Sequence, residues 1–119
     1  MATEGVEAIF LETHNWGRAA KFFLALGYEI EFDTGHNSGQ FRNRTGPSVF
    51  IAEVPEDREV HTRIVMRVPD AEAFAADPVV EVVTPFEATH YGTLEMTVRD
   101  PDGRTWTLQA PPKPSAEPA

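Results

Sequence analysis

The chain has 119 residues, and its 19 acidic residues outnumber 10 basic ones, which gives a formal net charge of −9. This length fits one domain. A surface with this excess of acidic residues repels the phosphates of nucleic acid. No apolar run reaches the length of about 18 residues that is needed to cross a membrane. The sequence has no cysteine, which excludes disulfides and thiolate chemistry, and with no signal peptide at its start it predicts a cytoplasmic protein.

The first half of the chain predicts a strand, a helix and three more strands. Residues 6–13 are apolar with polar interruptions, which predicts a largely buried strand. Asn15 is a favourable N-cap, and apolar side chains three to four residues apart predict a helix that ends at Gly27, a residue able to adopt a positive φ. Three shorter strands follow, separated by turn residues: residues 28–32, 40–43 and 48–54.

The second half, after a charged connector at residues 55–59, predicts a similar pattern. Asp70 is the expected cap of a short helix, residues 71–76, which Pro78 ends. Four strands are expected around it: residues 61–68, 79–83, 93–99 and 105–109. An Asp-Pro-Asp-Gly turn at residues 100–103 precedes the last strand, because Pro fixes φ and Gly accepts a positive φ.

The chain therefore predicts one α+β domain over residues 1–110, built from two βαβββ modules at about residues 6–54 and 60–110. Residues 111–119 are rich in proline and lack large apolar side chains, which predicts a disordered tail. Each module has one helix for one face of its sheet, so the other face is either covered by another element or left open as a concave site.

Three stretches resemble the vicinal oxygen chelate superfamily, which includes glyoxalase I, extradiol dioxygenases and bleomycin-resistance proteins. They are the helix end at residues 19–28, the segment 65–70, and residues 99–106, whose Asp-Pro-Asp-Gly turn is the most specific. The resemblance covers about residues 6–110. It implies paired βαβββ modules that form a cup-shaped mixed sheet, usually completed in a homodimer.

Metal enzymes of this superfamily place four ligands, usually His, Glu or Gln, His and Glu, on cup-facing strand positions. The resemblance places these positions at Glu7, at Ile51 or Glu53, at Arg63 or His61, and at Thr107. Ile51 has no donor atom and Arg63 is permanently cationic, and a set of Glu7, Glu53 and His61 needs two register shifts. We therefore predict no metal, no cofactor and no catalytic residue, with a divalent-metal lyase, isomerase or dioxygenase as the alternative.

The superfamily's other use is binding without turnover, as in its drug-sequestering resistance proteins. In that use Glu7 and Glu53 face a cation or a hydroxyl, and Arg63 bonds a carbonyl, stacks on a flat ring or pairs with one of these carboxylates. Residues 84–92 are too polar and turn-rich for an ordinary strand, and loops on a rigid scaffold often carry binding. The resemblance implies that the aromatic-Gly step at Tyr91 and Gly92 lines the cup mouth. The predicted ligand contacts are Glu7, Leu11, Phe32, His36, Ile51, Glu53, Arg63, Phe86, His90, Tyr91 and Thr107.

Several aromatic side chains around a cup favour a planar, partly apolar guest, because stacking adds about 0.5–1.5 kcal/mol per ring pair. We therefore predict a homodimeric protein that sequesters an aromatic natural-product antibiotic of the anthraquinone or enediyne type and so confers resistance. A flavin fits the same slot, and a dimeric domain that binds another metabolite is a further interpretation. The net charge either attracts a cationic ligand or serves solubility alone.

Overall fold

The structure is a computed structural model that describes residues 3–112, so residues 113–119 of the predicted tail lie outside the described residues. Within this range the chain forms the elements β1-α1-β2-β3-β4-β5-β6-β7-β8. They fall into two compact units: Val6–Val65, called here the first unit, and residues 3–5 with 66–112, called the second unit. No helix in the described range has the length and apolar character needed to cross a membrane.

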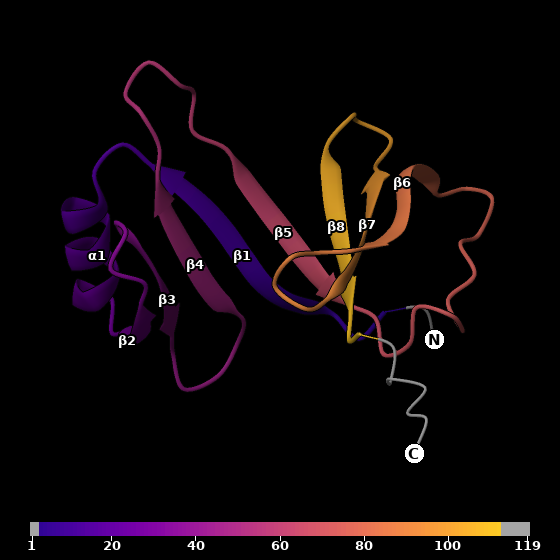
Figure 1. The fold of residues 1–119 in the computed structure, drawn as a ribbon, viewed down its shortest axis with the longest axis horizontal. Helices are drawn as coiled ribbons and strands as arrows, with labels where there is room; N and C mark the ends of the chain where they lie inside the picture. The colour runs from indigo at the N-terminus through magenta and orange to yellow at the C-terminus, as the bar shows by residue number, and fades with distance from the viewer. Residues whose placement is uncertain (1–2, 113–119) are drawn as a thin grey trace. The chain divides into compact units, whose positions relative to one another are not determined.

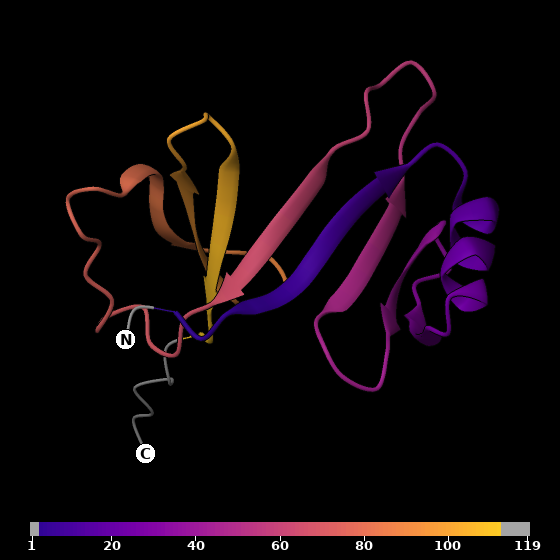
Figure 2. The same ribbon diagram turned by 180° about the vertical axis from the view of Figure 1, so that it is seen from behind.

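The first unit is a mixed sheet with one helix. Its elements are β1 (Val6–Thr13), α1 (Trp16–Ala25), β2 (Glu29–Asp33), β3 (Ser38–Arg42), β4 (Ser48–Glu53) and the beginning of β5 (Thr62–Arg67). The strand order is β2-β3-β4-β1, with β5 next to β1. β1 runs parallel to β4, whereas β3 is antiparallel to both β2 and β4. Figures 1 and 2 show α1 beside this sheet, close to β2 and β3.

The core of the first unit lies between α1 and one face of the sheet. Ala20, Phe41, Val49 and Ile51 are buried there, with partly buried side chains packed around them. β1 and β4 are paired in register, with Ile9 beside Val49. Because side chains alternate along a strand, every second residue of β1 and β4 must project from the opposite face.

Both ends of α1 follow the sequence prediction. The Asn15 side chain accepts a hydrogen bond from the Arg18 N–H at 3.0 Å, and Gly27 has a φ of 95°. The Glu53 carboxylate accepts a second bond, from the Trp16 N–H at 2.8 Å. Two of the backbone donors that the first turn of a helix leaves without helical partners are thereby satisfied.

The second unit contains the end of β5 and three more strands, β6 (Glu81–Ala88), β7 (Leu94–Arg99) and β8 (Thr105–Ala110). β8 lies next to β5, followed by β7 and then β6 at the edge, and the β6–β7 and β7–β8 pairs are antiparallel. Its buried core consists of Val68, Met96, Val98, Leu108 and Ala110.

The predicted helix at residues 71–76 is wrong, because residues 71–73 form a turn and the second unit has no helix in its described part. The Asp70 carboxylate accepts from the Glu72 N–H at 3.0 Å, and Asp77 accepts likewise from Val79 at 2.9 Å. Such bonds within a short segment compete with helix formation. The segment is also too short to gain from helix propagation.

The predicted strand at residues 79–83 is displaced, since β6 begins at Glu81 and continues to Ala88 through Pro85. Proline lacks an N–H and disfavours an interior strand, but an edge strand needs no donor on its outer side. β6 is such an edge strand. The sequence therefore suggested a loop where the edge of the sheet accommodates a strand.

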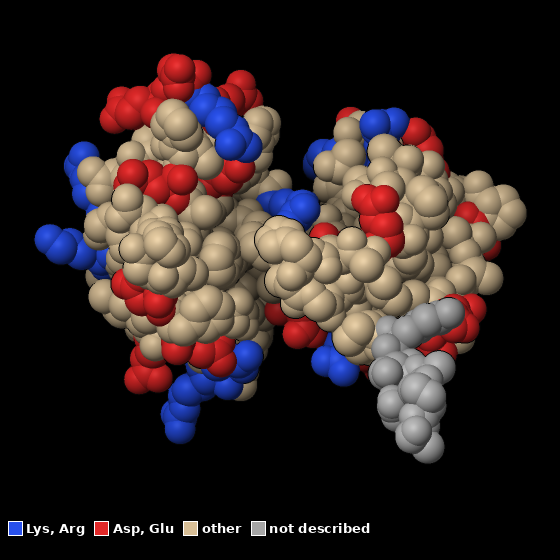
Figure 3. Space-filling model, viewed as in Figure 1, with Lys and Arg blue, Asp and Glu red and all other residues tan. Residues whose placement is uncertain are grey.

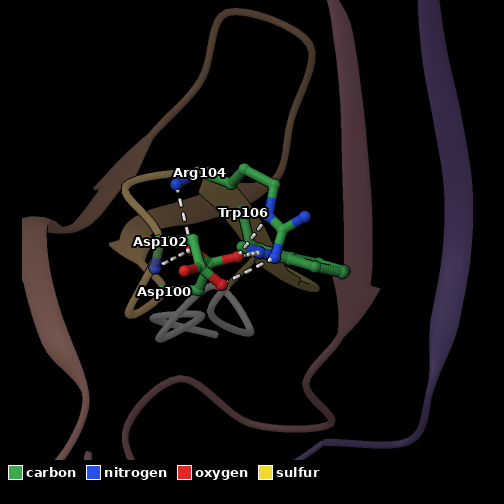
Figure 4. A network of polar contacts seen from close by, with 4 residues as sticks. All are labelled: Asp100, Asp102, Arg104 and Trp106. Carbon is green, nitrogen blue, oxygen red and sulfur yellow. Dashed lines mark hydrogen bonds and ion pairs between the residues drawn. The ribbon is translucent and has the colours of Figure 1, made fainter.

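The predicted Asp-Pro-Asp-Gly turn is confirmed, with a positive φ of 87° at Gly103. The Asp100 carboxylate accepts hydrogen bonds from Trp106 Nε1 at 3.0 Å, Arg104 Nε at 2.8 Å and two backbone N–H groups (Figure 4). The bond from Trp106, together with those from Arg104 and the backbone, lowers the pKa of Asp100 far below its usual value. This carboxylate therefore fixes the turn between β7 and β8.

Candidate functional site

A row of side chains crosses the face of the first unit that α1 does not cover. Phe32 on β2 is paired with Gln40 on β3, Gln40 with Phe50 on β4, and Phe50 with Phe10 on β1. Arg63 on β5 extends the row, because its guanidinium lies over the Phe10 ring. We call Phe10, Phe32, Phe50 and Arg63 the aromatic face.

The rings of the aromatic face contact one another at tilted angles. The centroids of Phe10 and Phe50 are 5.2 Å apart, and those of Phe32 and Phe50 are 6.2 Å apart. Arg63 Cζ is 4.8 Å from the centroid of the Phe10 ring. This distance is short enough for a cation–π attraction, which acts over about 6 Å. Phe32 remains 47% exposed. The four side chains thus form a continuous apolar strip that ends in a cation.

Small side chains lie on both sides of this strip. Ala8 precedes Phe10 by two residues on β1, and Ala52 follows Phe50 by two residues on β4, so both project from the same face. Ser48 is paired with Ala8, and Ser38 with Ala52. Phe50 therefore stands between the short side chains of Ser48 and Ala52 along β4, and Phe10 has Ala8 on one side and Glu12 on the other along β1.

Carboxylates near the aromatic face are already paired. Glu12 forms an ion pair with Arg58 at 2.9 Å and accepts from the His61 N–H at 3.0 Å. Glu31 accepts from Gln40 at 2.8 Å and forms an ion pair with Arg42 at 3.2 Å. These contacts, the Gln40 bond first, lower the pKa of Glu31. Arg63, in contrast, has neither a hydrogen bond nor an ion pair with any residue in the range 3–112.

The predicted orientation of four contacts in the first unit is wrong. Leu11 and Ile51 pack in the core against α1, and Glu53 bonds the start of that helix. Glu7 lies two residues before Ile9, so alternation places it on the α1 side as well. The cup-facing positions that the resemblance gave were shifted by one residue along the strands. A shift of one residue moves every side chain of a strand to the other face of the sheet.

Two further expectations in the first unit have different outcomes. The predicted ion pair of Arg63 with Glu7 or Glu53 is wrong, since the guanidinium stacks on Phe10 instead. Phe32 lies on the aromatic face, whereas His36 is exposed in the turn between β2 and β3, where its N–H donates to Thr34 Oγ1 at 3.1 Å. Only Phe32 and Arg63 of the predicted contacts in this unit therefore belong to the aromatic face.

The remaining predicted contacts lie in the second unit. Phe86 is part of β6, not of a loop, and its ring packs edge-on against Phe74 beside the core. His90 and Tyr91 share a turn with ring centroids 5.1 Å apart, and the Tyr91 hydroxyl donates to Glu95. Thr107 is 2% exposed and lies on the opposite face of β8 from Leu108.

Two aromatic residues of the site, Phe10 and Phe50, were missed as contacts. β1 and β4 are apolar on both faces around these positions, so alternation alone does not tell which side chains meet the helix. The parallel register of β1 and β4 settles the question. Among residues 3–112, no three His, Asp or Glu side chains come close enough together to hold a metal ion.

A scan against protein-family models gives no match, and neither does a search of curated proteins. Solved structures do share the fold. A glyoxalase/bleomycin resistance protein/dioxygenase superfamily member from Vibrio splendidus 12B01 superposes with a TM-score of 0.64 at 18% identity, over 88% of this chain and 98% of that one. Methylmalonyl-CoA epimerase from Mycobacterium tuberculosis gives a TM-score of 0.68 at 13% identity, over 95% of this chain and 91% of that one.

A third solved structure, described as NAD-dependent benzaldehyde dehydrogenase from Legionella pneumophila, gives a TM-score of 0.60 at 13% identity, over 87% of this chain and 97% of that one. These likenesses show the fold. The chain shares its α+β fold with a solved member of the glyoxalase/bleomycin resistance protein/dioxygenase superfamily, and this is the fold that the sequence resemblance implied. Identities this low do not transfer an activity or a ligand.

Proposed function

We propose that this protein binds a planar aromatic molecule on the aromatic face and sequesters it without turnover. The observation that carries the proposal is the strip of Phe10, Phe32 and Phe50 that ends at Arg63, on a sheet face free of α1. A natural-product antibiotic of the anthraquinone or enediyne type is the proposed guest, and protection from that compound is the proposed benefit.

The physical basis is the preference of flat rings for offset or edge-on contacts with aromatic side chains, worth about 0.5–1.5 kcal/mol per ring pair beyond the area buried. Phe32 is 47% exposed, and a guest would remove this apolar area from water. Phe10 and Phe50 are half-buried on the same face, and contiguous apolar patches on a protein surface often mark a binding site. The short side chains of Ala8 and Ala52 favour close approach of a flat guest.

We also propose that the protein acts as a homodimer. β2 and β6 are edge strands, and exposed edges are commonly covered by a partner. Light scattering over a range of protein concentrations tests this point. A monomer at every concentration, with and without guest, would contradict it.

The binding proposal is tested by titrating isotope-labelled protein with an anthraquinone series and following amide chemical shifts. We expect shifts around Phe10 and Phe50, and weaker binding after Phe50→Ala. Phe22→Ala is the matched control, because Phe22 is 59% exposed and belongs to α1, on the other side of the sheet. Absence of shifts with every member of the series refutes the proposal, as does an equal loss of affinity in both variants.

A further inference from the structure

We infer that the molecule held on the aromatic face carries an anionic group, such as a carboxylate, sulfonate or phenolate on the ring system, which the Arg63 guanidinium binds. The inference rests on the proposed function and adds a chemical class to it. It starts from the charges of the first unit and from the geometry of Arg63.

Arg63 is the cation of the aromatic face that an anionic group of a guest would neutralise. Glu12 on β1 and Glu31 on β2 are held by Arg58 and Arg42 respectively. Among the described residues the guanidinium of Arg63 forms neither a hydrogen bond nor an ion pair, and it lies over the Phe10 ring. A guest anion would therefore meet a cation without a competing carboxylate partner.

The contact of Arg63 with the Phe10 ring also holds its donors at the end of the strip. A guanidinium carries five N–H groups in one plane, and contact of that plane with a ring leaves its edge available to a carboxylate, which it binds through two parallel bonds. Arg63, held over the Phe10 ring, is thus placed to form an ion pair with an anionic group of the guest.

The row fixes where the rest of the guest would lie. Neighbouring strands are about 4.8 Å apart, so the two steps from β5 across β1 to β4 span about 10 Å. A fused ring system whose anionic group contacts Arg63 would therefore extend over Phe10 and Phe50 toward Phe32. The order of the row, with the cation at one end and rings along the rest, matches an aromatic acid.

The formal charge of −9 does not oppose this inference. Figure 3 shows acidic side chains over both units, with basic side chains among them. Charges of this kind act on an approaching ligand over about 8–10 Å at physiological salt. In the bound state the direct contact with Arg63 outweighs the screened contribution of more distant carboxylates.

The experiment compares three ligands that share one ring system: anthraquinone-2-carboxylate, its neutral carboxamide and a cationic aminomethyl analogue. Binding is measured by calorimetry near neutral pH. We expect the carboxylate to bind about tenfold tighter than the carboxamide, the effect of one charge-assisted bond pair, and the cation to bind weakest. High salt should weaken the carboxylate and leave the carboxamide unchanged.

Arg63→Gln should abolish the preference for the carboxylate over the carboxamide, and Arg63→Lys should keep part of that preference. Arg18→Gln is the matched control, because it removes one cation from α1, on the opposite side of the sheet. Arg63 is exposed, so the variants should keep the circular dichroism spectrum of the wild type.

Each outcome has one meaning. Equal affinity for carboxylate and carboxamide overturns the anionic guest and leaves the proposed function standing. A preference that persists in Arg63→Gln overturns the role of Arg63. Failure of all three ligands to bind overturns the proposed function and this inference with it.

Discussion

Gly39 on β3 has no room for a Cβ between β2 and the Trp16 side chain of α1, and an added methyl group there tests the packing of the first unit. A Cβ built on Gly39 would lie 2.7 Å from the Phe32 carbonyl oxygen and 2.9 Å from Trp16 Cη2. The oxygen belongs to the backbone of β2, the strand paired with β3. It cannot yield without moving that strand, and the indole must yield as well.

Overpacking of this kind costs about 1–3 kcal/mol, so Gly39→Ala should lower the free energy of unfolding by about that amount. Urea unfolding followed by tryptophan fluorescence measures it. The midpoint should fall while the slope stays unchanged, which separates lost stability from a change in the area exposed on unfolding.

Gly17→Ala is the matched control, because it adds the same methyl group to α1. The nearest atom to its Cβ is Asn15 Oδ1 at 3.7 Å, an ordinary contact, and alanine favours a helix over glycine by about 0.5–1 kcal/mol. This variant should be more stable than the wild type. If Gly39→Ala unfolds at the wild-type midpoint, Trp16 does not cover β3, and the division of the sheet into a helix side and an aromatic face is refuted.

Three other predictions follow from the same geometry. Ile51→Ala should lower the free energy of unfolding by about 2–5 kcal/mol in the same urea assay, because Ile51 is 1% exposed in the core against α1. A small effect would indicate that Ile51 lies on the open face instead. Asp100→Asn should destabilise the protein at neutral pH, and its unfolding midpoint should converge with that of the wild type as the pH falls below about 4. The reason is that a carboxylate whose pKa is lowered in the folded state stabilises the fold above its unfolded pKa of about 3.9 and loses that effect in acid. Unfolding midpoints of the two proteins that change in parallel with pH would contradict this account. Asn15→Ala should cost about 0.5–2 kcal/mol of stability through loss of the bond from the Arg18 N–H, and an unchanged thermal midpoint would argue against the cap.

Local chemistry explains which elements the sequence predicted well. The cap at Asn15, the positive φ at Gly27 and the turn at Gly103 depend on residues within a few positions of one another. Each of these signals acts without help from the rest of the chain. The strands that alternate or follow such turns were accordingly placed within one or two residues.

Tertiary context explains what the sequence missed. Pro85 is compatible with β6 because that strand lies at the edge of the sheet and its pairing with β7 is irregular between Thr84 and Glu87. The segment after Asp70 forms turns through bonds to its own backbone, although its composition also suits a helix. Neither outcome can be read from the residues concerned alone.

The difference between local signals and tertiary context also affects the candidate site, on the open face of β1 and β4. Counting placed Glu7 and Ile51 in the cup, and the register instead brings Phe10 and Phe50 to the side that α1 leaves free. The correction exchanges a carboxylate and an aliphatic side chain for two aromatic rings. The reason for favouring an aromatic guest therefore changes from the turn-borne aromatics of the second half to a strip built into the sheet. A site on paired strands holds its rings in fixed positions, as selective binding of a flat molecule requires.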